Sequence, residues 1–185
     1  MRVISGTAKS LRLKTPEGMD TRPTTDRIKE TLFNMLQPLL PGSLFVDLFS
    51  GSGGIGIEAL SRGADHAYFV ENEKRAVFCI VENLRFTRLT DRATVLKTDV
   101  LSALYSIHER EADILFMDPP YDCGHEQRVL AILGELPWIT ENTLVVIETS
   151  LRSDISYLGE LGFSLEKEKR YKTNRHLFCR KIKKI

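Results

Sequence analysis

The hydrophobic pattern of the chain switches repeatedly between short apolar runs and apolar residues at helical spacing. The short apolar runs predict buried strands at residues 44–49, 67–70, 93–96, 113–117 and 143–147. Helical spacing predicts helices at residues 54–62, 73–89 and 126–136. Strands and helices that alternate in this way indicate an α/β fold, in which helices cover both faces of a parallel sheet.

The first part of the chain, ahead of this alternation, has a different pattern. Residues 1–14 alternate between apolar and polar positions around Gly6, which predicts a small β-hairpin. A loop rich in proline and glycine follows. Thr24 or Thr25 is then a suitable N-cap for a helix whose apolar residues recur as far as Leu39.

The last part of the chain also contains strand-like alternation. Residues 163–165 and 177–179 alternate and predict a second hairpin. No internal repeat or low-complexity segment interrupts the chain. We therefore expect an N-terminal hairpin extension at residues 1–21 and a main domain at residues 22–185.

The composition is that of an ordinary water-soluble protein of one domain. The 185 residues are 42% hydrophobic and 28% charged, and no apolar run approaches the roughly 20 residues that span a bilayer. Cys79, Cys123 and Cys179 lie far apart and form no CxxC pair. We therefore expect reduced thiols, no metal site, a cytoplasmic location and a monomer.

Charge is unevenly distributed along the sequence. Residues 1–14 and 169–185 hold 12 of the 26 lysine and arginine residues and no acidic residue. All 25 acidic residues lie between them. Basic ends on an acidic body favour contact with a polyanion such as nucleic acid, although two solvated tails would have the same composition.

A glycine-rich segment follows the first predicted strand, where ligands bind in open parallel sheets. Gly51, Gly53 and Gly56 match the spacing of a dinucleotide-binding turn, and Glu71 follows Gly51 by 20 residues. This spacing predicts an adenosine-containing cofactor but does not separate NAD from S-adenosylmethionine. Asp47 favours the second, because a carboxylate repels a pyrophosphate and attracts the ammonium group of a methionine moiety.

Acidic residues follow the second and third predicted strands. Glu71 is placed to accept hydrogen bonds from two ribose hydroxyls, whereas Glu73 is better suited to the N-terminus of a helix. Asp99 has two compatible roles: it can accept a hydrogen bond from an adenine amino group, and it can cap a short helix that begins at Val100.

The most specific motif is Asp118-Pro119-Pro120-Tyr121, which follows the fourth predicted strand. An exocyclic amino group has two hydrogens, which the Asp118 carboxylate and the Pro119 carbonyl can each accept. Holding both hydrogens directs the nitrogen toward a methyl donor, and Tyr121 offers a ring on which a base can stack. The motif predicts methyl transfer to an amino group of a base, although a rigid structural turn is the simpler alternative.

Together these motifs resemble the class I S-adenosylmethionine-dependent methyltransferases that act on amino nitrogens. Residues 22–34, RPTTDRIKETLFN, and the start Arg-Val-Ile-Ser-Gly are similar to a narrower group, the RsmD family of bacterial 16S ribosomal RNA (guanine-N2)-methyltransferases. The resemblance covers nearly the whole chain and is weakest at residues 151–170. It implies a Rossmann-like sheet of seven strands, with the last strand antiparallel, and an N-terminal hairpin.

The resemblance also implies a partner and a set of site residues. The substrate would be one guanine of 16S ribosomal RNA, within the small ribosomal subunit. The cofactor S-adenosylmethionine would be held by Asp47, Gly51, Gly53, Glu71 and Asp99, and the base by Asp118, Pro119 and Tyr121. Candidate contacts to RNA phosphates are Arg2, Lys9, Arg22, Arg27, Lys172 and Arg175, with His176 as a weaker candidate. Arg22 and Arg27 have a simpler role as ion-pair partners of Asp26 and Glu30.

Rival functions remain open on the sequence alone. A DNA adenine-N6 methyltransferase uses the same Asp-Pro-Pro-Tyr motif, but this chain has no long insertion that would read base edges. A protein glutamine methyltransferase would resemble Asn-Pro-Pro-Tyr instead. An NAD-dependent oxidoreductase needs an acid or base at a hydride-transfer site, which we do not find. A non-catalytic RNA-binding assembly protein has no need for an intact Asp118 and glycine loop.

Overall fold

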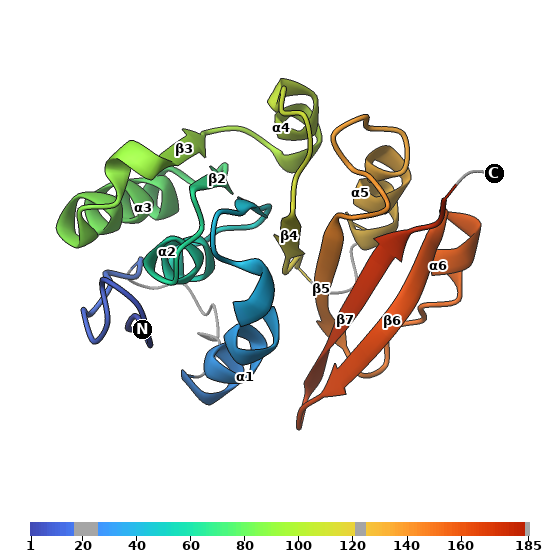
Figure 1. Cartoon of the computed structure of the whole chain (residues 1–185), viewed down its shortest axis with the longest axis horizontal. Coiled ribbons are helices and arrows are strands. Elements are labelled where there is room, and N and C mark those ends of the chain that lie inside the picture. The colour runs from blue at the N-terminus through green and yellow to red at the C-terminus, as the bar shows by residue number, and fades with distance from the viewer. Residues whose placement is uncertain (17–25, 121–124, 184–185) are drawn as a thin grey trace.

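Seven strands form one sheet in the order β3-β2-β1-β4-β5-β7-β6 (Figure 1). The structure is a computed structural model and describes residues 1–16, 26–120 and 125–183. The strands are β1 (Leu44–Asp47), β2 (His66–Val70), β3 (Ala93–Leu96), β4 (Ile114–Met117), β5 (Leu144–Ser150), β6 (Phe163–Arg170) and β7 (Asn174–Lys181). Strands β1 to β5 pair in parallel, and β7 pairs antiparallel with both β5 and β6. The predicted α/β class and the reversal at the end of the sheet are confirmed.

The helices connect the strands as the periodicity predicted. They are α1 (Asp26–Leu36), α2 (Gly54–Ser61), α3 (Lys74–Thr87), α4 (Val100–Ser106), α5 (His125–Leu133) and α6 (Tyr157–Glu160), with 3₁₀ turns η1 (Gln37–Leu39) and η2 (Thr90–Arg92). The short helix α6 was not predicted. The proposed caps of α1, Thr24 and Thr25, lie outside the described residues.

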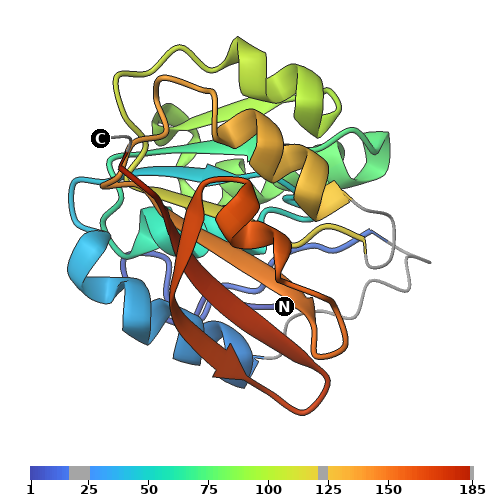
Figure 2. The same ribbon diagram turned by 90° about the vertical axis from the view of Figure 1, so that its right-hand side faces the viewer.

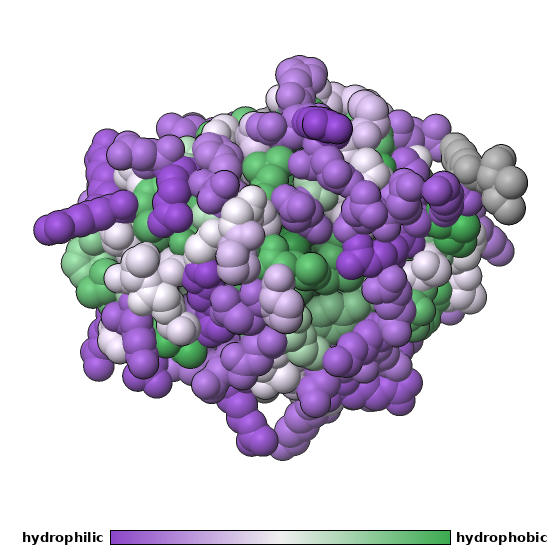
Figure 3. All heavy atoms as spheres, in the orientation of Figure 1, coloured by the Kyte–Doolittle hydropathy of each residue, from purple (hydrophilic) through white to green (hydrophobic). Residues whose placement is uncertain are grey.

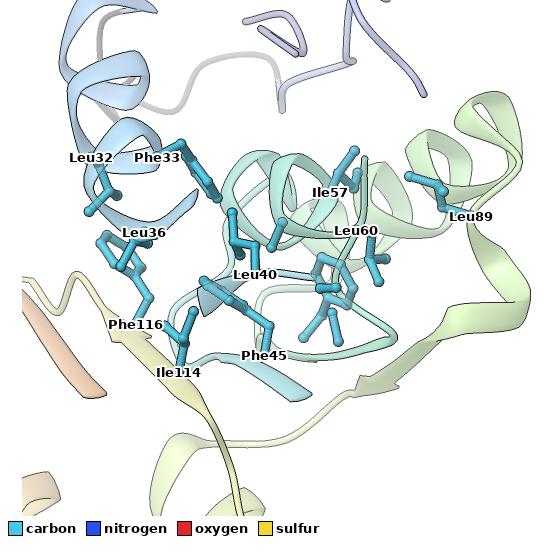
Figure 4. Packing of buried hydrophobic residues seen from close by; sticks show 14 of the residues in the cluster. Leu32, Phe33, Leu36, Leu40, Phe45, Ile57, Leu60, Leu89, Ile114 and Phe116 are labelled. Atoms are coloured by element: carbon cyan, nitrogen blue, oxygen red, sulfur yellow. The ribbon is translucent and has the colours of Figure 1, made fainter. Parts of the chain in front are cut away.

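Helices cover the two faces of the sheet, with one hydrophobic core on each face (Figure 2). Helices α1, α2 and α3 pack on one face, and Figure 4 shows Phe33 of α1 and Leu60 of α2 directed into the core above Phe45 of β1. Helices α4, α5 and α6 pack on the other face. Strand residues alternate between the two cores, so Phe116 belongs to the first and Met117 to the second.

The predicted N-terminal hairpin does not form regular strands. In the described residues 1–14, strand pairing is limited to one isolated antiparallel bridge, between Arg2 and Arg12. The reason is that helix α2 takes the backbone N–H groups that a longer ladder would need. Those of Ile4 and Ser5 donate to the Glu58 carboxylate at 2.7 and 3.0 Å.

Glu58 is a buried carboxylate that joins three parts of the chain. Besides the N-terminal backbone, it pairs with Lys29 Nζ of α1 at 3.2 Å and with Arg62 Nε at 2.8 Å. Lys29 is itself fully buried and also donates to the carbonyl of Arg2 at 2.5 Å. Burial lowers the pKa of Lys29, while the charge of Glu58 opposes that change. A buried pair is retained only where further hydrogen bonds satisfy its atoms, and here both partners have them.

Strand β6 forms one edge of the sheet and is mostly exposed. Its sequence, FSLEKEKR, alternates acidic and basic side chains, and its register with β7 is irregular between Leu165 and Lys167. Hydrophilic residues cover most of the face seen in Figure 3, with a hydrophobic patch near its centre. Among the described residues, no helix is long and apolar enough to cross a membrane.

Gly6 allows the N-terminal segment to lie directly on helix α2. Its φ is +83°, and a Cβ built there would lie 1.7 Å from the carbonyl oxygen of Ser61. We expect Gly6→Ala to lower the free energy of unfolding by at least about 2 kcal/mol, through both overlap and the left-handed backbone. Denaturant unfolding followed by circular dichroism measures this loss.

Gly42→Ala is the matched control for Gly6→Ala. Gly42 has a similar φ of +77°, but a Cβ there would meet nothing within 4 Å in the part of the chain that the structure describes. It should therefore cost only the backbone part, about 1 kcal/mol. Equal losses in the two variants would contradict the close packing of the N-terminal segment on α2.

Candidate functional site

The parallel strands bring four predicted segments to the same edge of the sheet. Backbone hydrogen bonds continue beyond the strands and hold the following loops together. Ser50 N donates to the carbonyl of Val70 at 3.0 Å, and Glu71 N donates to that of Leu96 at 3.2 Å. The residues that follow β1, β2, β3 and β4 therefore lie beside one another, where ligands bind in open parallel sheets.

The glycine loop between β1 and α2 presents its backbone to open space. Gly51 and Gly53 have φ values of +53° and +81°, which other residues rarely adopt. A Cβ built on Gly51 would meet no atom of the described residues within 4 Å, so these residues leave space above Gly51 for a ligand. Gly56 has a different role, because a Cβ there would lie 2.4 Å from the ring of Phe69.

Asn83 of α3 fixes this loop from behind. Its amide nitrogen donates to the carbonyls of Ser52 and Lys14, each at 2.9 Å, and its amide oxygen accepts from Lys14 N at 2.8 Å. Asn83 is 1% exposed. One buried amide thus connects the glycine loop, helix α3 and the N-terminal segment, and sequence patterns gave no indication of this contact.

Asp47 lies at the end of β1 and is buried under the glycine loop. Its Oδ2 accepts a hydrogen bond from Gly56 N at 3.1 Å, in the first turn of α2. Burial raises the pKa of Asp47 to about 7, although the bond from Gly56 opposes the rise. The carboxylate therefore orients helix α2 in this structure, and its contact with a methionine ammonium stays a prediction.

Glu71 is held rigidly between two loops. Its Oε2 accepts from Gly51 N at 2.9 Å, and its Oε1 accepts from Asn72 N and Glu73 N at the same distance. These bonds fix the plane of the carboxylate beside the open space at Gly51. Three of the roughly four lone-pair sites of the carboxylate are used by these bonds, so Oε2 can still accept from one ribose hydroxyl.

Two other acidic residues cap helices, as the sequence predicted. Glu73 precedes α3 and accepts from Arg75 N at 2.9 Å. Asp99 precedes α4, and its Oδ1 accepts from Ser102 N at 3.0 Å. Hydrogen bonds from Ser102 lower the pKa of Asp99, which keeps it ionised. The proposed contact of Asp99 with adenine is compatible with this cap and stays a prediction.

Asp118 and Pro119 follow β4 at the centre of the sheet edge. Asp118 is half-buried and Pro119 is buried. Burial, together with the negative charges of Glu148, Asp47 and Glu126, raises the pKa of Asp118 to about 8. The third residue predicted for the base site, Tyr121, lies outside the described residues.

A buried polar cluster next to Asp118 was missed from the sequence. Glu148 of β5 contacts His176 Nε2 of β7 through Oε2 at 2.9 Å, and its Oε1 accepts from Asn174. His176 Nδ1 lies 3.2 Å from the hydroxyl of Tyr171. The signal was present, because Glu148 ends the apolar run of β5 as Asp118 ends that of β4. Glu148 therefore adds a fifth strand end to the four that carry sequence motifs.

The residues predicted to contact RNA have different environments. Lys9, Arg27 and Lys172 are exposed. Arg2 is exposed but pairs with Asp26 at 2.7 Å. Arg22 lies outside the described residues.

Arg175 differs from these surface cations because it is 6% exposed. Its guanidinium pairs with Glu168 at 3.0 Å and donates to the carbonyl of Ser153 at 2.5 Å. It therefore joins β7 to β6 and to the turn after β5. No described residues form a cluster of three histidine, cysteine or acidic side chains that could hold a metal ion.

Comparisons with known proteins agree with this arrangement. A family described as conserved hypothetical protein 95 matches residues 1–180. YlbH of Bacillus subtilis, provisionally named an rRNA methyltransferase, is 42% identical over 80% of this chain and 82% of its own length. The ribosomal RNA small subunit methyltransferase D of Escherichia coli K12 is 31% identical over 91% of this chain and 84% of its own length. A solved Escherichia coli structure, provisionally described as the methyltransferase yhhF, has a TM-score of 0.85 and 29% identity over 98% of each chain.

The raised pKa of Asp118 makes stability depend on pH in a defined direction. The folded state keeps a proton that the unfolded state loses above about pH 4, so this contribution to stability falls as pH rises toward 8. Asparagine does not titrate. We compare the free energy of unfolding of Asp118→Asn with that of the unmodified protein. This difference should shift in favour of the variant by at least about 1 kcal/mol when the pH is raised from 5 to 8. Denaturant unfolding at the two pH values measures this shift.

Asp154→Asn is the control for this pH effect. Asp154 is fully exposed, and hydrogen bonds from Ser156 lower its pKa, so it is ionised at both pH values in both states. Its effect on stability should be the same at pH 5 and pH 8. If Asp118→Asn behaved like this control, Asp118 would already be ionised at pH 5.

Proposed function

The chain belongs to the family described as conserved hypothetical protein 95, to which ribosomal RNA small subunit methyltransferases D are similar, and from this we propose a specific reaction. The protein transfers a methyl group from S-adenosylmethionine to the exocyclic N2 amino group of a guanine in 16S ribosomal RNA. One observation carries the proposal: Asp118 and Pro119 end β4 at the same sheet edge as the glycine loop and Glu71. A methyl donor and an amino group acceptor would meet there.

The residues at the edge have the chemistry that the cofactor needs. The open space at Gly51 lets a ligand approach the backbone, and Glu71 would accept a hydrogen bond from a ribose hydroxyl through Oε2. Asp99 would accept from the adenine amino group through Oδ2, because Oδ1 caps α4. Asp47 would attract the positively charged ammonium and sulfonium in its ionised form, because a pKa raised only to about 7 lets it lose its proton when a cation binds.

The proposed base site matches the two hydrogens of the guanine N2 amino group. Asp118 and the Pro119 carbonyl would each accept one hydrogen of the N2 amino group and so orient its lone pair. When bound, S-adenosylmethionine supplies a methyl group on a positively charged sulfur. Asp118 and Pro119 would aim the nitrogen lone pair at that methyl carbon, and the electron pair of the C–S bond would stay on sulfur as the leaving group. The nitrogen then loses one proton, for which the Asp118 carboxylate is a suitably placed acceptor.

Exposed cations would hold the RNA. Lys9, Arg27 and Lys172 have side chains in water and would contact phosphates around the target base. Arg175 is better assigned to the structure of the β6–β7 hairpin, because its guanidinium is already paired. A small enzyme with few elements that read bases must recognise the shape of its RNA, which favours an assembled small subunit as substrate.

The central test is methyl transfer to small ribosomal subunits from cells that lack this protein. We expect labelled methyl groups to appear as N2-methylguanosine in digested 16S ribosomal RNA. Asp118→Asn should lower the rate at least about 100-fold, because one acceptor for the developing charge becomes a neutral amide. Its affinity for S-adenosylhomocysteine, measured by calorimetry, should be unchanged. Label in DNA as N6-methyladenine, with none in ribosomal RNA, would reject the proposed substrate.

A second test concerns Glu71 and the ribose. Removing a charged hydrogen-bond acceptor costs about 1.5–3 kcal/mol, so Glu71→Ala should weaken binding of S-adenosylhomocysteine roughly tenfold or more. Glu73→Gln is the control, because Glu73 lies two residues away and caps α3. Equal affinities for the two variants by calorimetry would show that Glu71 only supports the glycine loop.

A further inference from the structure

Glu148 occupies the same place on β5 that Asp118 occupies after β4. The two strands are parallel, and their last paired residues are Met117 and Ile147. The next residue of each strand therefore lies beside the other, about 5 Å apart, with both side chains on the same face of the sheet. In agreement, the pKa of Asp118 is raised more by the charge of Glu148 than by any other neighbouring charge.

The carboxylate of Glu148 is held in one orientation by three residues of the β6–β7 hairpin. Asn174 donates to Oε1, and the His176 ring contacts Oε2 at 2.9 Å. Tyr171 fixes the other side of that ring through its hydroxyl and an edge-to-face contact. Glu148 is 5% exposed and His176 is fully buried. A side chain so constrained presents its remaining lone pairs in a fixed direction.

Two carboxyl groups side by side in a partly buried site are energetically unfavourable, because burial and mutual repulsion both disfavour their ionised forms. The partners of Glu148 among the described residues are an amide and a histidine ring, and no lysine or arginine pairs with it. A neutral side chain would fill the position at lower cost. Acidic groups that have no lysine or arginine partner, at a sheet edge where ligands bind, favour a role in recognition.

The hydrogen-bonding edge of guanine matches two adjacent acceptors. Guanine carries an amino group at N2 next to a ring N1–H, so both positions donate. In adenine and cytosine, the ring nitrogen beside the amino group accepts instead. A second carboxylate beside the one that holds the amino group would attract guanine and repel the other two bases.

We propose that Glu148, positioned by His176 and Asn174, accepts the N1–H of the target guanine and thereby selects guanine among the bases that carry an amino group. This inference rests on the proposed function, because it places the guanine N2 group at Asp118. It makes the β6–β7 hairpin part of the base site: the hairpin orients the residue that recognises the base.

The test replaces the target base by 2-aminopurine, which keeps the N2 amino group but has no hydrogen on N1. After the methylated nucleotide is mapped with the unmodified enzyme, small subunits are reconstituted with guanine or 2-aminopurine at that position. Initial rates are measured for the unmodified enzyme, for Glu148→Gln and for Glu166→Gln. Glu166 lies on β6, is exposed and pairs with Arg180, so this control makes the same chemical change outside the site.

The unmodified enzyme and Glu166→Gln should both strongly prefer guanine. In Glu148→Gln the rate on guanine should fall at least about tenfold, since one good base contact gives tenfold to hundredfold discrimination. Its preference should shift at least about tenfold toward 2-aminopurine, because the amide of glutamine can donate to the bare N1. Comparing the ratio of rates between enzymes cancels the effect of the missing O6.

Each other outcome overturns the inference in a distinguishable way. Absence of N2-methylguanosine with the unmodified enzyme overturns the proposed function and this inference with it. Normal methylation of guanine with an unchanged ratio in Glu148→Gln overturns the inference alone. The inference alone is also overturned if Glu148→Gln binds S-adenosylhomocysteine normally but is equally impaired on guanine and on 2-aminopurine. If Glu148→Gln does not fold, Glu148→Asp withdraws the carboxylate by one methylene and should lose rate on guanine but not on 2-aminopurine.

Discussion

Parallel pairing of β1 to β5 places the carboxyl ends of five strands at one edge of the sheet. Each strand there ends in a polar or glycine-rich segment, although most of the residues within the strands are apolar. The sheet thus brings together residues between positions 47 and 148 that are far apart in the sequence. Because the backbone ladder fixes the register, the relative heights of Asp118 and Glu148 are set by the strands and not by the loops that follow them.

The N-terminal segment and helix α1 depend on a second constraint, the buried carboxylate of Glu58. It gathers two backbone N–H groups and two cations, which compensate for the loss of water around the charge. Removing one partner would leave an uncompensated charge in the core, so the arrangement resists partial change. Through Lys14 and Asn83, the same segment reaches the glycine loop. The support of the cofactor site therefore includes residues that no local motif identifies.

The sequence predicts what depends on local periodicity, and it fails where distant groups compete for the same backbone. Strands β1 to β5 follow from their apolar runs, and the caps Glu73 and Asp99 follow from their positions before helices. The N-terminal hairpin is limited to one antiparallel bridge, because Glu58, more than 50 residues away, accepts from the backbone N–H groups of Ile4 and Ser5. Arg175 was predicted as a contact to RNA, whereas in the structure Glu168 and the Ser153 carbonyl hold its guanidinium inside. Tyr121 and Arg22 lie outside the described residues, so their predicted roles stay predictions.

The β6 edge has a consequence for how these molecules behave at high concentration. An open edge offers unpaired backbone groups to which the sheet of another copy can add. Here the edge strand carries alternating acidic and basic side chains and an irregular register, and both features hinder such addition. A second chain would have to match opposite charges at every step and a local bend as well. The sheet can therefore end in water without becoming a template for aggregation. Strand β7, on the inner side of the hairpin, carries the residues that orient Glu148.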